Sequence, residues 1–189
     1  MVDSGMNVID IGCGPTPMLY FTRPFLKVDS AIMVTGSHNP PDHNGFKMMI
    51  GDKSFYGDDI KSLYQTILQK DFIKGNGSIK SINILEQYKN ILLEKSGPFK
   101  PISVVWDCGN GSSGKLIEKL VKKLPGEHHV IYSEIDGNFP NHHPDPVVEK
   151  NLYDLIFHVK KNKADLGIAF DGDGDRIGVV DKYGGIVPG

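Results

Sequence analysis

The sequence predicts an α/β protein of two consecutive domains, in which mixed sheets are flanked by helices. Three observations lead to this class. Several segments repeat apolar residues at the spacing of a helix, and the short, often β-branched apolar runs between them are typical of strands. From Pro101 onward strands and helices alternate, and this alternation produces a sheet with helices packed on it.

The first half of the chain begins with a predicted strand over residues 8–11, followed by strands over 31–34 and 46–50. Apolar residues at helical spacing then predict helices over 60–68 and 85–92. Because many of the strands are continuous apolar runs, we expect them to be buried on both faces.

The second half follows the same rules. Its predicted elements, in chain order, are a strand over 103–106, a helix over 116–124, a strand over 130–132, a helix over 152–159, and strands over 166–170 and 177–180.

A domain boundary is predicted where Gly97, Pro98 and Pro101 follow a predicted helix, because glycine and proline end helices and suit a linker. The predicted domains are residues 1–96 and 97–189. We expect the first domain to be incomplete at its amino-terminal end, because strand 8–11 has little chain before it that could form a neighbour.

Composition excludes several classes of protein. Lysine and arginine total 21 against 23 aspartate and glutamate residues, so the net charge of -2 gives no general attraction to nucleic acid or membranes. The two cysteines lie far apart and cannot form a dense disulfide framework. The amino terminus has no signal-peptide pattern, and no apolar run is long enough to span a membrane. We therefore expect a cytoplasmic protein.

A polar loop follows the predicted strand 31–34 and contains Ser37. The run Thr35-Gly36-Ser37-His38-Asn39 and the two prolines after it favour unusual backbone angles, so the loop exposes the serine at the carboxyl end of a strand. Ligand sites of open α/β sheets gather at that edge. A serine hydroxyl can accept and return a phosphoryl group if a cation neutralises the phosphate and a base moves protons.

Two residues near this serine could assist it. Lys47 lies in a predicted strand, where alternation sends its side chain to the face opposite Phe46 and Met48. It could therefore line a cleft, and His38 is a second candidate. The competing interpretation is that the segment is only a polar turn and that His38 is an ordinary solvated histidine.

A second polar loop, Asp171-Gly172-Asp173-Gly174-Asp175, follows the predicted strand 166–170. The alternating glycines let the backbone curl so that three carboxylates converge, and their mutual repulsion calls for a cation. Ligands that are all oxygen select a hard divalent ion, with Mg²⁺ favoured where a phosphate oxygen completes the shell. Arg176 could offset part of the charge or hold a phosphate.

Two alternatives compete with this metal site. An EF-hand also begins with Asp at loop positions 1, 3 and 5, but it requires glycine where Arg176 stands and glutamate where Lys182 stands. A solvated acidic turn remains the structural alternative.

Two weaker signals lie in the second half. The glycine-rich run over 107–114 joins a strand to a helix and could present backbone N–H groups to an anion, although a tight turn is the favoured interpretation. It has neither the Walker-A nor the Rossmann spacing. The run over 136–146 contains His142, His143 and carboxylates, and we interpret it as a structural loop in preference to a transition-metal site.

Together these motifs resemble the α-D-phosphohexomutase superfamily, and within it the bacterial phosphomannomutase/phosphoglucomutase family. The resemblance rests on Thr-Gly-Ser37-His-Asn-Pro and on Asp171-Gly-Asp-Gly-Asp-Arg176. It extends to Gly14-Pro-Thr-Pro-Met18, Asn44-Gly-Phe-Lys47 and the runs over 107–111, 136–146 and 164–170. It covers nearly the whole chain, as the later part of a first domain followed by a second domain.

The resemblance implies a role for each residue of the two motifs. Ser37 becomes phosphorylated, and Asp171, Asp173, Asp175 and a phosphoserine oxygen bind Mg²⁺. Lys47 transfers protons, whereas His38 and Arg176 contact the phosphate or the sugar hydroxyls and Asn39 shapes the loop. A sugar bisphosphate such as glucose 1,6-bisphosphate supplies the phosphoryl group of Ser37.

The resemblance also implies an activity and a missing portion. Family members interconvert hexose 6-phosphate and hexose 1-phosphate of mannose or glucose, and they have four domains. The sugar-reading loop and the carboxyl-terminal phosphate loop belong to domains 3 and 4, which this chain lacks, so hexose phosphates and those domains are its expected partners. Two alternatives stay open: a truncated fragment or paralogue that binds metal and phosphate without turnover, and a metal-dependent phosphatase that uses Ser37.

Overall fold

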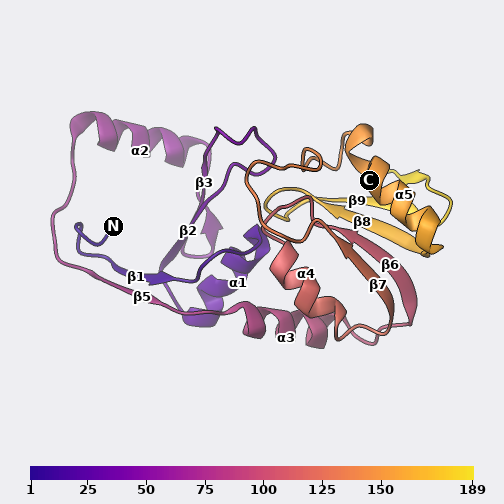
Figure 1. Ribbon diagram of the computed structural model, residues 1–189. Helices are drawn as coiled ribbons and strands as arrows, with labels where there is room; N and C mark the ends of the chain where they lie inside the picture. Colours follow the sequence, from indigo (N-terminus) through magenta and orange to yellow (C-terminus); the bar gives the residue numbers. More distant parts are fainter.

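The computed structural model describes residues 1–189 and confirms the α/β class, with mixed sheets flanked by helices (Figure 1). The second half forms one five-stranded sheet in the order β10-β9-β8-β6-β7. Its strands are β6 (Ile102–Asp107), β7 (Gly126–Ile131), β8 (Leu166–Phe170), β9 (Ile177–Asp181) and β10 (Ile186–Val187). Strand β6 pairs in parallel with β7 and β8, whereas β8–β9 and β9–β10 are antiparallel.

Three helical segments belong to this sheet: α4 (Gly114–Val121), a 3-10 turn over Glu149–Leu152, and α5 (Tyr153–Asn162). Each segment predicted beyond Pro101 exists, in the predicted order, with ends shifted by a few residues; only β10 was not predicted. No helix of the structure is long and apolar enough to cross a membrane.

The main core lies between α5 and the sheet. Leu152, Leu155 and Val159 pack against Val105 and Val180, and all five are almost completely buried. Strand alternation sends the neighbouring Val104, also buried, to the opposite face. On that face Trp106 and Ile168 are half-buried and Ile177 is 58% exposed, so the sheet is fully packed on the α5 face and only partly covered on the other.

The first half consists of smaller pieces (Figure 1). A three-stranded antiparallel sheet contains β2 (Ser30–Val34), β3 (Phe46–Ile50) and β4 (Lys53–Ser54). Strand β1 (Asn7–Asp10) pairs in parallel with β5 (Ser78–Ser81). The first predicted strand thus finds its neighbour downstream, in a segment that we did not predict as a strand.

The helices of the first half are α1 (Thr16–Leu26), α2 (Asp58–Gln69) and α3 (Leu85–Ser96). No residue of α2 is buried. Strands β2 and β3 keep exposed apolar side chains, so the expectation that the strands of this half are buried on both faces was wrong. Helix α1 was missed, because Pro17 and Pro24 argue against a helix. Pro17 is tolerated because it lies in the first turn, where N–H groups have no helical partner.

Helix α3 links the two halves. Its Tyr88, together with Ile84, packs with Met18 of α1 and Leu116 of α4 in a second buried cluster. Glu86 of α3 also accepts hydrogen bonds from Lys89 and from Lys119 of α4, and these two cations lower the pKa of its carboxyl to about 2. The boundary predicted after residue 96 stays a prediction.

The core predicts the effect of a truncation in α5. Replacing Leu155, which is fully buried, by alanine removes packing against the sheet and leaves a cavity. We expect the free energy of unfolding to fall by about 2–5 kcal/mol in urea denaturation. The matched control is Phe157→Ala on the same helix, where the side chain is 58% exposed, and its loss should be much smaller. Equal losses in the two variants would contradict the assigned core.

Candidate functional site

Ser37 lies three residues beyond strand β2 in a tightly folded loop. Its φ angle of 52° is left-handed, a conformation that costs a non-glycine residue roughly 1 kcal/mol. The loop compensates with hydrogen bonds: the Ser37 N–H donates to Thr35 Oγ1 at 2.8 Å, and the Thr35 N–H donates to the Gly45 carbonyl at 3.0 Å. The serine is therefore held in a fixed orientation at the carboxyl end of its strand.

The carboxylate loop turns between strands β8 and β9. Asp171 organises it, because its Oδ1 accepts the backbone N–H groups of Asp175 and Arg176 at 3.0 Å each. Asp171 and Asp173 are buried and Asp175 is more exposed. One ligand oxygen from each of the three carboxylates lies within 4.8 Å of the others, so the predicted convergence is present.

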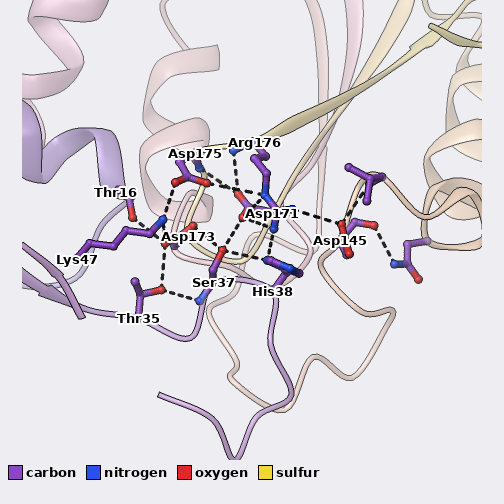
Figure 2. Close-up of polar contacts among 12 residues, drawn as sticks. Thr16, Thr35, Ser37, His38, Lys47, Asp145, Asp171, Asp173, Asp175 and Arg176 are labelled. Atoms are coloured by element: carbon purple, nitrogen blue, oxygen red, sulfur yellow. Dashed lines mark hydrogen bonds and ion pairs between the residues drawn. The ribbon is translucent and has the colours of Figure 1, made fainter. Parts of the chain in front are cut away.

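The serine loop and the carboxylate loop meet, although they come from the two halves of the chain (Figure 2). Ser37 Oγ lies 2.9 Å from Asp171 Oδ2 and 3.1 Å from Asp173 Oδ1. The backbones also touch, since a Cβ added to Gly172 would lie 2.1 Å from the Ser37 carbonyl oxygen. Only glycine permits this approach.

Lys47 reaches the carboxylates from strand β3. Its Nζ lies 2.7 Å from Asp173 Oδ2 and 2.5 Å from Asp175 Oδ2. Burial alone would lower the pKa of Lys47, but the hydrogen bonds and charges of the two carboxylates outweigh burial and raise it. Burial would likewise raise the pKa of Asp173, but the hydrogen bonds from Lys47 and Thr16 lower it. Both groups are therefore charged at neutral pH.

Arg176 covers the other side of the cluster. Its Nε and Nη2 donate to Asp171 Oδ2 at 3.2 and 3.1 Å, and its Nη1 lies 3.9 Å from Asp145 Oδ1. Nη2 also contacts His38 Nδ1, which lies 3.2 Å from Ser37 Oγ. His38 therefore lies between Ser37 and the guanidinium of Arg176 (Figure 2).

Asn39 is the one predicted site residue outside this polar cluster. Its backbone N–H donates to the Gly36 carbonyl at 2.9 Å. It lines a neighbouring pocket of about 270 Å³, together with Asn44 of the serine loop and Asn110 and Phe139 of the second half.

Three polar residues of the site were not predicted. Thr16 and Thr35 donate to Asp173 Oδ2 at 2.8 and 3.1 Å, and Asp145 faces Arg176. All three fall in motifs that carry the family resemblance, which was the only available signal. Their partners lie elsewhere in the chain, so spacing alone could not identify them.

The weaker signals have structural roles. The N–H of Ser112 donates to the carbonyl of Gly172 at 2.9 Å, so the turn before α4 holds the carboxylate loop. Gly111 also packs against this loop, because a Cβ added to it would lie 2.6 Å from the Gly172 carbonyl oxygen. His142 Nε2 lies 2.9 Å from the fully buried Asp107 Oδ2, so this histidine fastens the 136–146 loop to the end of β6.

The donor set defines what the cluster could hold. Its three carboxylates and one hydroxyl are hard oxygen ligands, which suit Mg²⁺ better than a transition metal. Lys47 and Arg176 offset two of the three negative charges of the carboxylates. One negative charge remains, so the residues present fit an additional cation. A hydroxyl among carboxylates and cations is an arrangement suited to phosphoryl transfer.

Comparison with known proteins places both halves in one family. The family model described as phosphoglucomutase/phosphomannomutase, alpha/beta/alpha domain I, matches residues 1–74, and that of domain II matches residues 82–185. A phosphomannomutase/phosphoglucomutase of Pseudomonas aeruginosa PAO1 is 46% identical over 99% of this chain and 40% of its own length. A phosphoglucomutase of Neisseria gonorrhoeae is 43% identical over 99% of this chain and 41% of its own.

A solved structure agrees with these sequence matches. The crystal structure of a phosphoglucomutase/phosphomannomutase family protein from Burkholderia thailandensis matches 98% of this chain and 42% of its own, with a TM-score of 0.92 and 44% identity. The chain thus spans about 40% of the length of the curated relatives it matches.

The His142–Asp107 pair predicts a pH dependence of stability. Burial would lower the pKa of His142, but the hydrogen bond and charge of Asp107 raise it above its ordinary value of 6.5. The stabilisation by the charged histidine is therefore complete below about pH 6.5 and is lost as the pH rises through the folded-state pKa. We expect the stability difference between wild type and His142→Asn, measured by urea denaturation, to shrink from pH 6 to pH 9.

The control is His158→Asn, because His158 forms no ion pair with a carboxylate. Its stability difference from wild type should change little over the same range. A difference for His142→Asn that grows with pH would show that the pair does not stabilise the charged histidine.

Proposed function

The chain belongs to the phosphoglucomutase/phosphomannomutase family, and from this membership we propose that it carries the phosphoserine and the metal site of a phosphohexomutase. Such an enzyme interconverts hexose 6-phosphate and hexose 1-phosphate, here of mannose or glucose. The observation that carries the proposal is the position of Ser37 Oγ within 3.1 Å of two buried carboxylates from the other half of the chain.

The proposed reaction uses Ser37 as a phosphoryl carrier. A sugar hydroxyl attacks the phosphorus of phosphoserine and gives its proton to a base, the bond from phosphorus to Ser37 Oγ breaks, and that oxygen takes up a proton as it leaves. The resulting bisphosphate turns over in the site. Ser37 Oγ then loses its proton and attacks the other phosphoryl group, whose bond to the sugar oxygen breaks to release the product hydroxyl. Lys47 is proposed as the proton-transfer residue, because its charged Nζ lies beside Asp173, which also contacts the serine, and could donate a proton to the leaving Ser37 Oγ.

His38 and Arg176 are proposed to contact the phosphate in the active site or the sugar hydroxyls of the substrate. The guanidinium of Arg176 contacts the imidazole of His38, and Asp171 and Asp145 hold the guanidinium in place. A planar guanidinium whose three nitrogens all face carboxylates keeps its remaining N–H groups aimed in one direction. Asn39 is proposed to shape the loop next to these residues.

Asp171, Asp173, Asp175 and an oxygen of phosphorylated Ser37 are proposed to hold Mg²⁺. When bound, a divalent cation supplies positive charge that stabilises the transferring phosphoryl group. Residues of this chain orient the carboxylates. Backbone N–H groups of the same loop hold Asp171, and the hydroxyl of Thr16 from the first half holds Asp173.

Recognition of the sugar is proposed to lie outside this chain, because the chain spans about 40% of the relatives' length. Domains 3 and 4 of the family would supply the sugar-reading loop and a second phosphate-binding loop. The alternative is a protein that takes up metal and phosphate without turnover. Transfer of a phosphoryl group to Ser37 separates these functions.

Phosphorylation of Ser37 tests the proposal directly. After incubation with glucose 1,6-bisphosphate and Mg²⁺, intact mass spectrometry should detect one added phosphoryl group, and peptide mapping should place it on Ser37. Ser37→Ala should abolish the increase in mass, whereas Ser54→Ala, which alters an exposed serine of β4, should not. Absence of labelling with Mg²⁺ present would favour binding without turnover.

Metal binding to the carboxylate loop gives a separate test. Mg²⁺ should raise the melting temperature of the wild type, because a ligand that binds only the folded state stabilises it. Asp173→Asn should lose most of that increase. Asp59→Asn changes an exposed carboxylate of α2 and should retain it. If Mg²⁺ shifts neither wild-type nor phosphorylated protein, the proposed metal site is wrong.

A further inference from the structure

Thr16 makes two contacts with Asp173 that join the halves of the chain. Its hydroxyl donates to Asp173 Oδ2 at 2.8 Å, and its backbone N–H donates to the Asp173 carbonyl at 2.7 Å. Thr16 is fully buried, and Figure 2 shows it beside Lys47, on the Asp173 side of the cluster. These contacts link helix α1 to the carboxylate loop.

The position of Thr16 in its helix explains the backbone contact. It is the first residue of α1, and the first N–H groups of a helix have no partner within the helix. The Asp173 carbonyl supplies that partner. The same end of the helix carries partial positive charge, which favours a nearby carboxylate.

The hydroxyl of Thr16 has a choice of acceptors. Met33 Sδ lies 3.2 Å from Thr16 Oγ1, but a thioether is a weak acceptor and an ionised carboxylate is a strong one. The single hydroxyl proton therefore goes to Asp173. Because Thr16 is buried, water cannot replace this donor if it is removed.

The two oxygens of Asp173 have different environments. Oδ2 receives three donors from the first half of the chain: the hydroxyls of Thr16 and Thr35 and the ammonium of Lys47. Oδ1 faces Ser37 Oγ at 3.1 Å. The three donors prevent rotation of the carboxylate and keep Oδ1 toward the serine.

We propose that Thr16 is a positioning residue of the metal site, which orients Asp173 so that Oδ1 is directed to the cation beside Ser37. This inference rests on the proposed function and adds to it a residue that acts through Asp173 rather than on the substrate. Helix α1 thereby takes part in the site, because it supplies the Thr16 hydroxyl that donates to Asp173 of the carboxylate loop.

The test measures metal affinity in the 189-residue protein. Dissociation constants for Mn²⁺, used as the spectroscopic probe of the Mg²⁺ site, are obtained from the EPR signal of the free ion. Thr16→Val removes the hydroxyl and keeps the shape of the side chain, whereas Thr16→Ser keeps the hydroxyl. We expect Thr16→Val to weaken Mn²⁺ binding about 10-fold to 100-fold, the usual effect of losing a partner of a metal ligand. Thr16→Ser should bind nearly as wild type does.

Thr22→Val is the matched control. Thr22 is another buried threonine of α1, and its hydroxyl donates to the Met18 carbonyl at 2.6 Å, within the helix. Its replacement should leave the Mn²⁺ affinity unchanged. Thermal unfolding of all variants in EDTA reports the stability of the metal-free fold separately.

Each outcome decides the proposal. Weaker binding in Thr16→Val alone, with metal-free stability comparable to that of Thr22→Val, supports it. Equal affinities of Thr16→Val and wild type overturn it while leaving the proposed function intact. A Thr16→Val protein that is unfolded in EDTA overturns it as well, because the hydroxyl would then stabilise the fold. If the wild type binds no Mn²⁺, the metal site of the proposed function fails first.

Discussion

The constraint on which this structure depends is the convergence of three carboxylates in one loop. Their ligand oxygens lie within 4.8 Å of one another, and two of the residues are buried. Like charges at this distance repel strongly where little water screens them. The groups that contact these carboxylates are hydrogen-bond donors and cations, and together they make the folded arrangement possible.

The compensating groups come from both halves of the chain. The second half supplies Arg176 and the backbone N–H groups that surround Asp171. The first half supplies Lys47 and the hydroxyls that meet Asp173. Neither half alone supplies all of these groups, so the site is complete only when the two halves are packed together.

Much of this site could be predicted from local residues. Ser37 and the carboxylate loop are identifiable because strand, loop chemistry and glycine spacing occur within a few positions. The alternation of strands and helices beyond Pro101 was equally local. Thr16 could not be found in this way, because its partner Asp173 is 157 positions away and prolines obscure its helix. The pairing of β1 with β5 was missed because β5 is short and polar, and its partner lies at the other end of the domain.

Gly172 has a consequence for redesign of this site. The approach of its backbone to the Ser37 carbonyl leaves no room for a side chain, so main-chain contact sets the spacing between the serine and the carboxylates. Exchanging Asp173 or Asp175 for another ligand would keep this spacing, because neither carboxylate takes part in the main-chain contact. Asp171 is different, because its carboxylate also holds the backbone of the loop.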